Sequence, residues 1–165
     1  ALTFGYNHHF DKEHHVLVFD YGNSNLNISI LEIDGGMYEV KTTACHPNFG
    51  VEDIDFKLIT YFADRFQQKY QKDIRQSPRS FMLLRRVCER AKQALTVSQT
   101  ATVTCDSIIE GIDLVDNITR EEFEKLNEEL FQYVLNPIKQ ALKDANMNKN
   151  EIDDILLFGG SSRIL

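Results

Sequence analysis

The spacing of the hydrophobic residues along this 165-residue chain changes several times, and each change restricts the fold. Residues 16–20 (VLVFD) form a continuous apolar run, and residues 25–33 (NLNISILEI) alternate between apolar and polar side chains. Both patterns are typical of β-strands. Residues 34–36 (DGG) predict a hairpin turn, after which residues 37–44 (MYEVKTTA) return as a strand. We therefore predict a three-stranded meander in this part of the chain.

The middle of the chain carries helical patterns instead. From about Val51 an apolar residue recurs every four positions, and this pattern persists for about six helical turns. The apolar residues of this stripe are Ile54, Leu58, Phe62, Phe66 and Tyr70. A second helix is predicted to begin at Ser77 and Pro78, which are favourable at the N-cap and in the first turn. Its apolar stripe comprises Leu84, Val87, Cys88, Ala91 and Leu95.

Strand patterns then return. Residues 100–109 and 111–118 alternate and are joined around Glu110-Gly111, which predicts another hairpin. Near the end of the chain, residues 154–158 (DILLF) form a buried strand that runs into Gly159-Gly160. Strands and helices therefore alternate along the chain, and the predicted fold class is α/β.

A further helical region lies between these strands. Thr119 and Glu122 have the spacing of a capping box, which marks the start of a third helix. Pro137 is expected to begin or kink a fourth segment that ends near Met147.

Composition excludes several classes of partner. The formal net charge is −7, so nucleic acid and anionic membrane surfaces are poor partners. No apolar run approaches the length of a membrane span. The three cysteines are an odd number without paired spacing, which favours reduced thiols and a cytoplasmic location.

The two ends of the sequence and its histidines lead to further expectations. The chain opens with ALTFGY, resembling the tail of a helix, and stops at GGSSRIL, where a helix should begin. We expect a piece cut from a longer protein. Residues 7–15 (NHHFDKEHH) are predicted to be a polar linker, in which four of the histidines would bind metal only adventitiously.

Three short segments could contact a nucleotide, although each has an ordinary structural explanation. The first is Asp20 with Gly22, where backbone N–H groups could approach phosphate and the carboxylate could hold magnesium or its water. A hairpin with a polar tip explains it equally. The second is CERAKQALT, whose residues Glu89, Lys92, Gln93 and Thr96 share one polar helix face at about 100° per residue. A solvated helix face is the simpler interpretation of this segment.

The third segment is LLFGGSSR, in which a strand and a glycine pair precede small hydroxyl residues. An anion or a purine could approach the backbone there, but an ordinary strand-to-helix turn is more frequent.

Taken together and in this order, the segments resemble one family over the whole chain. VLVFDYGNSNLNISIL, NFGVEDIDFKLITYF, CERAKQAL, DSIIEGIDL, ITREEFEKL and LLFGGSSRI match the 70 kDa heat shock protein chaperones collinearly. The chain resembles the second lobe (lobe II) of their nucleotide-binding domain. This resemblance implies an actin-like, ribonuclease H-like ATPase fold, in which a mixed sheet with flanking helices adjoins a smaller α/β subdomain. Residues 1–50 and 119–165 would form the sheet-based subdomain, and residues 51–118 the smaller one.

The resemblance also implies roles for particular residues. Asp20 would lie near magnesium, holding it indirectly through water. The phosphate loop would comprise Gly22, Asn23, Ser24 and Asn25, and Gly50 and Glu52 would lie near phosphate and ribose. The residues implied to face the adenosine are Glu89, Lys92, Gln93, Thr96, Gly159, Gly160, Ser161 and Arg163.

The sequence departs from the family's phosphate loop, which has consecutive glycines, then a threonine, and an aspartate two residues later. Asn23, Ser24, Asn25 and Asn27 occupy those places. Side chains at 23 and 24 narrow the approach to phosphate and prefer different backbone angles. Each lost charge-assisted hydrogen bond costs roughly 1.5–3 kcal/mol.

A second departure is at Gln93, which replaces an arginine that stacks on adenine, a cation–π contact worth about 1 kcal/mol. The site is therefore expected to be degenerate.

The predicted function follows from the resemblance. The parent protein would bind ATP or ADP with magnesium and regulate peptide binding through a separate domain. Its partners would be the missing lobe I, the peptide-binding domain, nucleotide exchange factors, co-chaperones and unfolded peptide clients. This chain alone is expected to be an inactive ATPase that requires no cofactor, because one wall of a cleft cannot surround a transferring phosphoryl group.

Two alternatives remain at this point. One is a non-catalytic scaffold that contacts co-chaperones without using ATP. The other is a sugar kinase or actin relative, against which CERAKQAL and the hairpin around Glu110-Gly111 argue.

Overall fold

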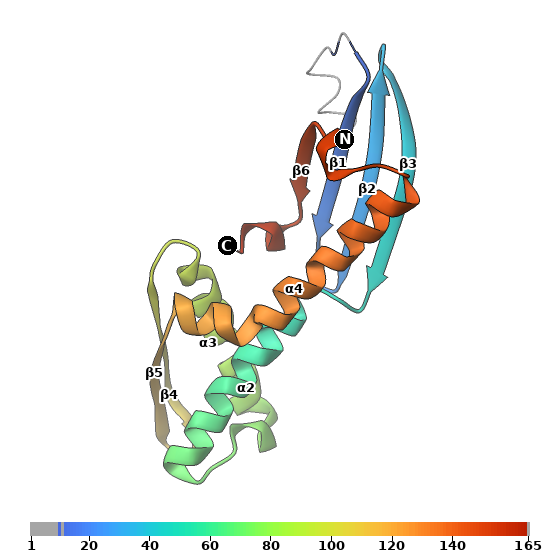
Figure 1. The fold of residues 1–165 in the computed structure, drawn as a ribbon. Coiled ribbons are helices and arrows are strands. Elements are labelled where there is room, and N and C mark those ends of the chain that lie inside the picture. Colours follow the sequence, from blue (N-terminus) through green and yellow to red (C-terminus); the bar gives the residue numbers. More distant parts are fainter. Residues whose placement is uncertain (1–9, 11, 165) are drawn as a thin grey trace. The chain divides into compact units, whose positions relative to one another are not determined.

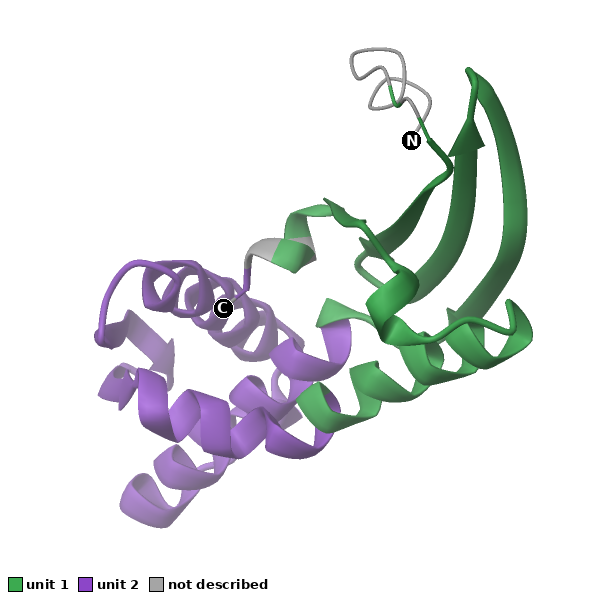
Figure 2. Cartoon of the chain, turned by 45° about the horizontal axis from the view of Figure 1, so that its top comes forward, with its two compact units in different colours: residues 1–51, 131–163 green, residues 52–130, 164–165 purple. Residues whose placement is uncertain are grey.

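The computed structural model describes residue 10 and residues 12–164, and it divides the chain into two compact units. Unit 1 comprises residues 1–51 and 131–163, and unit 2 comprises residues 52–130 and 164–165 (Figure 2). Unit 1 is thus built from two separate stretches of sequence, while nearly all of unit 2 is one continuous stretch.

Unit 1 is built on a four-stranded mixed sheet (Figure 1). Its strands are β1 (His14–Tyr21), β2 (Asn25–Asp34), β3 (Met37–Pro47) and β6 (Asp154–Phe158), in the order β3-β2-β1-β6. β1, β2 and β3 are successively antiparallel, which confirms the predicted meander. β6 pairs in parallel with β1. The α/β class with a mixed sheet is confirmed.

Local sequence explains how this sheet forms. Gly35 and Gly36 have φ angles of 53° and 83°, as a two-residue hairpin turn requires. The alternation in β2 buries Leu26, Ile28 and Ile30 completely. These residues form the centre of the unit 1 core.

The helix α4 (Arg120–Asp144) begins in unit 2 and ends in unit 1. It continues through Pro137, so no fourth segment begins there, and a kink at this proline stays a prediction. The proline ring is buried, and Ala141 one turn later is fully buried. The burial of this face offsets the backbone hydrogen bond that a proline cannot make. In the same unit the ring of Tyr133 lies 4.8 Å from that of Phe49.

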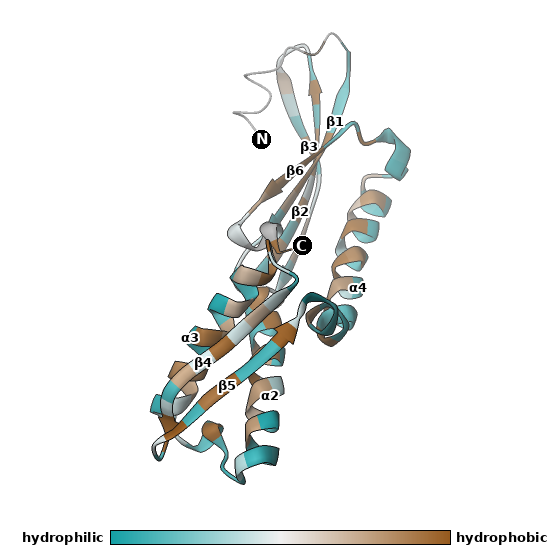
Figure 3. Cartoon of the chain, turned by 90° about the vertical axis from the view of Figure 1, so that its left-hand side faces the viewer, coloured by the Kyte–Doolittle hydropathy of each residue, from teal (hydrophilic) through white to brown (hydrophobic). Residues whose placement is uncertain are grey.

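Unit 2 combines helices with a two-stranded hairpin. It contains α2 (Val51–Tyr70), η1 (Ile74–Gln76), α3 (Pro78–Leu95), β4 (Thr100–Ile109), β5 (Ile112–Thr119) and the first part of α4. Figure 3 shows apolar and polar residues alternating along β4 and β5, which bury one face of each strand. The predicted stripe of α2 is confirmed, since Ile54, Leu58 and Phe62 are fully buried.

Polar contacts fix these elements within unit 2. Arg65 of α2 donates to both carboxylate oxygens of Asp116 on β5, at 2.8 and 2.9 Å. The buried Ser80 hydroxyl of α3 donates to the Ile108 carbonyl of β4 at 2.6 Å. Each bond joins a helix to the hairpin.

Two predicted helix starts are confirmed by their caps. The Ser77 hydroxyl accepts from the Ser80 N–H at 3.3 Å. The Thr119 hydroxyl accepts from the Glu122 N–H at 3.1 Å, and the Glu122 carboxylate accepts from the Thr119 N–H at 2.9 Å. The bonds that the Thr119 N–H and hydroxyl donate to the Glu122 carboxylate hold the pKa of Glu122 below its ordinary value.

The polar linker predicted over residues 7–15 is corrected at its end. Residues 7–9 and 11 lie outside the described residues, whereas His14 and His15 belong to β1. They pair with Ile33 and Glu32 of β2. Backbone pairing with β2 therefore extends the strand beyond its apolar run.

The strand β6 lies at the edge of the sheet and exposes apolar side chains. Ile155 and Leu157 are 62% and 60% exposed, and Phe158 is 45% exposed. Among the described helices, none combines the length and apolar character that crossing a membrane requires.

The burial within α2 predicts the effect of two phenylalanine substitutions. Phe62→Ala removes a fully buried ring and should lower the free energy of unfolding by about 3–5 kcal/mol. Phe56→Ala on the same helix removes a ring that is 64% exposed, and it should change stability by about 0.5 kcal/mol or less. Urea denaturation followed by circular dichroism measures both, and equal losses would contradict the described packing of α2.

Candidate functional site

The carboxyl ends of β1 and β6 lie side by side, and this is where the first and third predicted segments meet. Asp20 is the register partner of Phe158, so the turn after β6 begins beside the Asp20 carboxylate. A Cβ built on Gly159 would lie 2.1 Å from the Tyr21 carbonyl oxygen and 3.3 Å from Asp20 Oδ1. Gly159 also has a φ of 85°. Only glycine fits there, because both the space and the backbone conformation exclude a side chain.

The turn between β1 and β2 packs against a second backbone segment in the same way. Gly22 N–H donates to the Asn25 carbonyl at 2.9 Å, which closes the turn. A Cβ on Gly50 would lie 2.2 Å from the Asn23 carbonyl oxygen and 2.6 Å from Ser24 Cα. The side chains of residues 23, 24 and 25 are exposed. Two glycine-dependent approaches thus frame one end of the unit 1 sheet.

The asparagine substitutions do not strain this turn. Positive φ angles occur at neither Asn23 nor Ser24, and Gly22 also has an ordinary backbone conformation. Backbone angles that favour glycine are therefore not required in the turn as it stands. Any effect of these residues on phosphate must come from their side chains.

Asn27 occupies a sensitive position in this arrangement. It is the register partner of Asp20 on the neighbouring strand and is partly buried. An aspartate at this position would place two carboxylates directly opposite each other. The amide of Asn27 therefore leaves less negative charge at this end of β1 than an aspartate would.

The second predicted segment lies on α3 in unit 2. Glu89 and Gln93 are exposed and therefore accessible to a ligand. The Thr96 hydroxyl donates to the Gln93 carbonyl at 2.7 Å, so it caps the end of its own helix.

Lys92 does not share the exposed face predicted for it. Its Nζ lies 2.5 Å from Asp55 Oδ1 of α2, and the two side chains are only 6% and 14% exposed. Among the described residues this ion pair is the one polar contact of Asp55 Oδ1, and its geometry is not that of a hydrogen bond. Asp55 could not be predicted from the sequence, because no periodicity in α2 shows which carboxylate faces α3.

The other predicted positions differ in what the structure describes. Glu52 lies in unit 2, where its carboxylate is 3.7 Å from Arg85. Gly160 opens η3 (Gly160–Arg163), and a Cβ there would meet open space. The side chains of Ser161 and Arg163 lie outside the described residues.

Cys88 on α3 is a buried thiol, as its apolar neighbours predicted. It is completely buried, and burial, with a smaller contribution from Asp55, raises its pKa to about 12. The thiol therefore stays protonated and unreactive at neutral pH.

In unit 1 the structure thus brings together Asp20, the turn at residues 22–25, Gly50 and Gly159. Glu89, Lys92, Gln93 and Thr96 share α3 of unit 2. In open α/β sheets ligands bind outside the carboxyl ends of the strands, which is where Asp20 and these glycine turns lie.

Comparison with known proteins names the family. The sequence profile described as "Hsp70 protein" matches residues 1–165. The chain is 39% identical over 164 residues to a heat shock 70 kDa protein of Neurospora crassa, covering 99% of this chain and 25% of that protein. It is 40% identical to heat shock 70 kDa protein II of Paracentrotus lividus, covering 99% of this chain and 44% of that protein.

A third relative is a ribosome-associated molecular chaperone of Zygosaccharomyces rouxii, with 42% identity over 154 residues, covering 93% of this chain and 25% of that protein. The chain belongs to the 70 kDa heat shock protein family. It spans about a quarter to less than half of the length of these relatives.

Gly159 and Gly160 differ in the space around them, so their substitution should affect stability differently. Gly159→Ala should destabilise unit 1 by about 1–3 kcal/mol from the left-handed backbone alone, with a further cost from the collision with the Tyr21 carbonyl. Gly160→Ala should be nearly neutral, because its Cβ meets open space. Chemical denaturation measures the difference, and hydrogen exchange should localise it to β1 and β6. Equal behaviour of the two variants would refute the close approach.

Because Lys92 and Asp55 form a mostly buried ion pair, the effects of substituting them on the free energy of unfolding should be strongly non-additive. Lys92→Ala should cost roughly 3 kcal/mol or more, because it leaves a mostly buried carboxylate without its cation. The double variant with Asp55→Ala should be more stable than that single variant. Lys57→Ala is the matched control, since its partner Glu129 is 93% exposed, and it should cost about 1 kcal/mol or less. Unfolding free energies from denaturant titration give the coupling, and additive losses would contradict the pairing.

Proposed function

We propose that this chain supplies lobe II of the ATPase domain of a divergent 70 kDa heat shock chaperone. It would form the adenosine- and phosphate-facing wall of an ATP site that regulates peptide binding. The observation that carries the proposal is the convergence of Asp20, the exposed turn at 22–25, Gly50 and Gly159 at one end of the unit 1 sheet. Family membership supports it, because the matching region includes every one of these positions.

The donor groups present suit a nucleotide with magnesium. Asp20 would hold the ion through a water molecule, and the exposed groups of residues 23–25, beside Gly22 in the same loop, would donate to phosphate. Magnesium would neutralise the phosphate charge. Gly50 and Glu52 would lie near phosphate and ribose. The adenosine would be contacted by Glu89, Lys92, Gln93 and Thr96 of α3 and by Gly159, Gly160, Ser161 and Arg163.

Lys92 would serve two partners in this proposal. Its ammonium group has three N–H donors, and the contact with Asp55 uses one direction. Asp55 would therefore orient the ammonium while another N–H reaches the ribose. This makes Asp55 a positioning residue for the adenosine-binding helix.

The activity of the whole protein needs more than this chain. The first phosphate loop, the catalytic lysine and further acidic residues of the family would come from lobe I, so this chain alone would not hydrolyse ATP. Peptide clients, co-chaperones and nucleotide exchange factors would act on the full-length parent. The free thiols of Cys45, Cys88 and Cys105 suit the cytosolic location proposed for it.

The side chains at the turn favour one competing function. Asn23, Ser24, Asn25 and Asn27 replace the groups that bind phosphate most strongly in the family, as a non-catalytic scaffold would tolerate. Nucleotide affinity separates the two functions, because a scaffold retains its fold without binding ADP.

Calorimetric titration of the full-length parent with ADP and magnesium tests the proposal. We expect saturable binding with a dissociation constant in the micromolar range or tighter. A folded protein that releases no detectable heat would instead support the scaffold.

Restoring the family's side chains should strengthen binding. Asn25→Thr, Asn27→Asp and Gln93→Arg together should increase nucleotide affinity or turnover at least tenfold, since each regained charged contact is worth roughly 1 kcal/mol or more. Asn117→Asp on the exposed face of β5 makes the same chemical change as Asn27→Asp away from the turn, and it should have no effect. If the triple variant matches the unmodified protein, these substitutions do not explain a degenerate site.

A further inference from the structure

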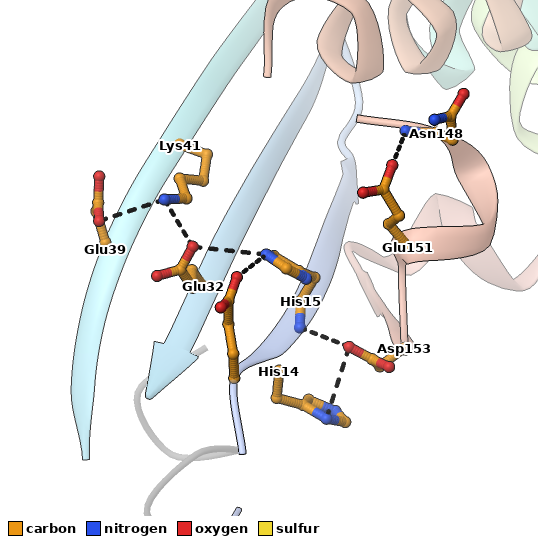
Figure 4. Close-up of polar contacts among 9 residues, drawn as sticks. His14, His15, Glu32, Glu39, Lys41, Asn148, Glu151 and Asp153 are labelled. Carbon is orange, nitrogen blue, oxygen red and sulfur yellow. Dashed lines mark hydrogen bonds and ion pairs between the residues drawn. The ribbon is translucent and has the colours of Figure 1, made fainter. Parts of the chain in front are cut away.

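The end of the unit 1 sheet where β1 begins carries a cluster of ionisable side chains (Figure 4). His15 Nε2 lies 3.1 Å from Glu13 Oε1 and 3.5 Å from Glu32 Oε2. The ligand atoms of these three residues all lie within 4.8 Å of one another. We call Glu13, His15 and Glu32 the His15 cluster.

Strand pairing holds two members of the cluster together. His15 and Glu32 are register partners in the antiparallel β1–β2 pair, so their side chains share one face. The His15 N–H donates to Asp153 Oδ2 at 2.8 Å, and the Asp153 N–H donates to the His15 carbonyl at 2.9 Å. His15 is therefore anchored by β2 on one side and by Asp153, the residue before β6, on the other, and its side chain is only 17% exposed.

A bulge in β3 delivers a lysine to the same place. The β2–β3 register shifts between Ile30 and Leu31, whose partners are Thr42 and Val40, so Lys41 is the extra residue. Glu32 and Glu39 are register partners, and like charges in that arrangement repel. Lys41 Nζ lies 2.6 Å from Glu32 and 3.4 Å from Glu39, between the two carboxylates.

Negative charge remains in excess around His15. Besides the three glutamates, Asp153 and Asp154 lie next to the neighbouring His14, whose Nε2 is 2.8 Å from Asp154 Oδ2. The ammonium group of Lys41 lies among these carboxylates, in contact with Glu32 and Glu39. One ammonium group does not neutralise the charge of these carboxylates. The Nε2 atom of His15 can bind one proton or one metal ion.

We propose that Glu13, His15 and Glu32 form a binding site for a divalent transition-metal ion, of which Zn²⁺ is the best match. One imidazole nitrogen and two carboxylate oxygens are ligands that zinc accepts, and water would complete the shell. Ligands about 2.1 Å from a tetrahedral ion are separated by about 3.4 Å, and the observed separations are 3.1 and 3.5 Å. Glu13 is 58% exposed and can adjust its position.

The partners behind the ligands would orient the site. Asp153 holds the His15 backbone, and Lys41 holds Glu32. Lys41 has a second role, because a cation beside Glu32 repels an incoming metal ion. In the metal-bound state its ammonium would shift toward Glu39, which already lies within 3.4 Å. The ion would tie residue 13 to β1 and β2, independently of any nucleotide.

Titration of the chain, freed of any affinity tag, with ZnCl₂ in a non-chelating buffer tests the site. We expect one saturable binding event per chain and a rise in melting temperature that EDTA reverses. Glu13→Gln should weaken binding at least tenfold without loss of fold, because its side chain is mostly exposed. His15→Gln should abolish the event. Lys41→Ala should tighten binding, because it removes the competing ammonium.

The neighbouring histidine is the matched control. His14→Gln removes an imidazole that faces Asp154 rather than the cluster, and it should leave zinc affinity within about twofold. Side-chain NMR should show the His15 ring, and not the His14 ring, changing on addition of zinc. Unchanged binding in Glu13→Gln, or a loss in His14→Gln equal to that in His15→Gln, would overturn the proposal.

Discussion

The parallel pairing of β1 with β6 is the interaction on which the candidate site depends. It joins residues more than a hundred positions apart and sets the end of one strand beside the end of the other. The pairing continues into the turn only because Gly159 has no Cβ to strike the Tyr21 carbonyl. Asp20 thereby acquires a neighbouring backbone turn. The close packing of Gly50 on the β1–β2 turn completes the same end of the sheet.

The polar groups of the chain follow two different arrangements. At the end of unit 1 that we propose to face nucleotide, exposed amides and hydroxyls stand where the family has groups with stronger affinity for phosphate. On α3, Lys92 is withdrawn from solvent and held by Asp55. A buried ion pair is costly to break and adds little net stability, so its value lies in fixing where the ammonium points. At the start of β1, by contrast, the carboxylates outnumber the cations.

Much of the architecture could be predicted from the sequence, because local rules agreed with the fold. The fourfold stripe of α2, the Ser77 cap and the Thr119–Glu122 capping box depend on residues close in sequence, and all were confirmed. The family's motifs also indicated which residues could form a site.

Other features depended on contacts between distant residues and could not be predicted. Pairing with Glu32 placed His15 in a strand although its neighbours are polar. Pro137 remains inside α4 because its ring is buried within unit 1. Lys92 is buried because it forms an ion pair with Asp55. The β3 bulge at Lys41 has no glycine or proline to mark it.

The discontinuity of unit 1 has a consequence for the order of assembly during synthesis. Residues 52–130 form one uninterrupted unit with local helix and hairpin contacts, which favours early and rapid formation. Until β6 has emerged from the ribosome, the β1 strand of the meander has no partner on one of its two edges. A member of a chaperone family would thus itself pass through a stage with an unpaired strand, the kind of surface on which nascent chains aggregate.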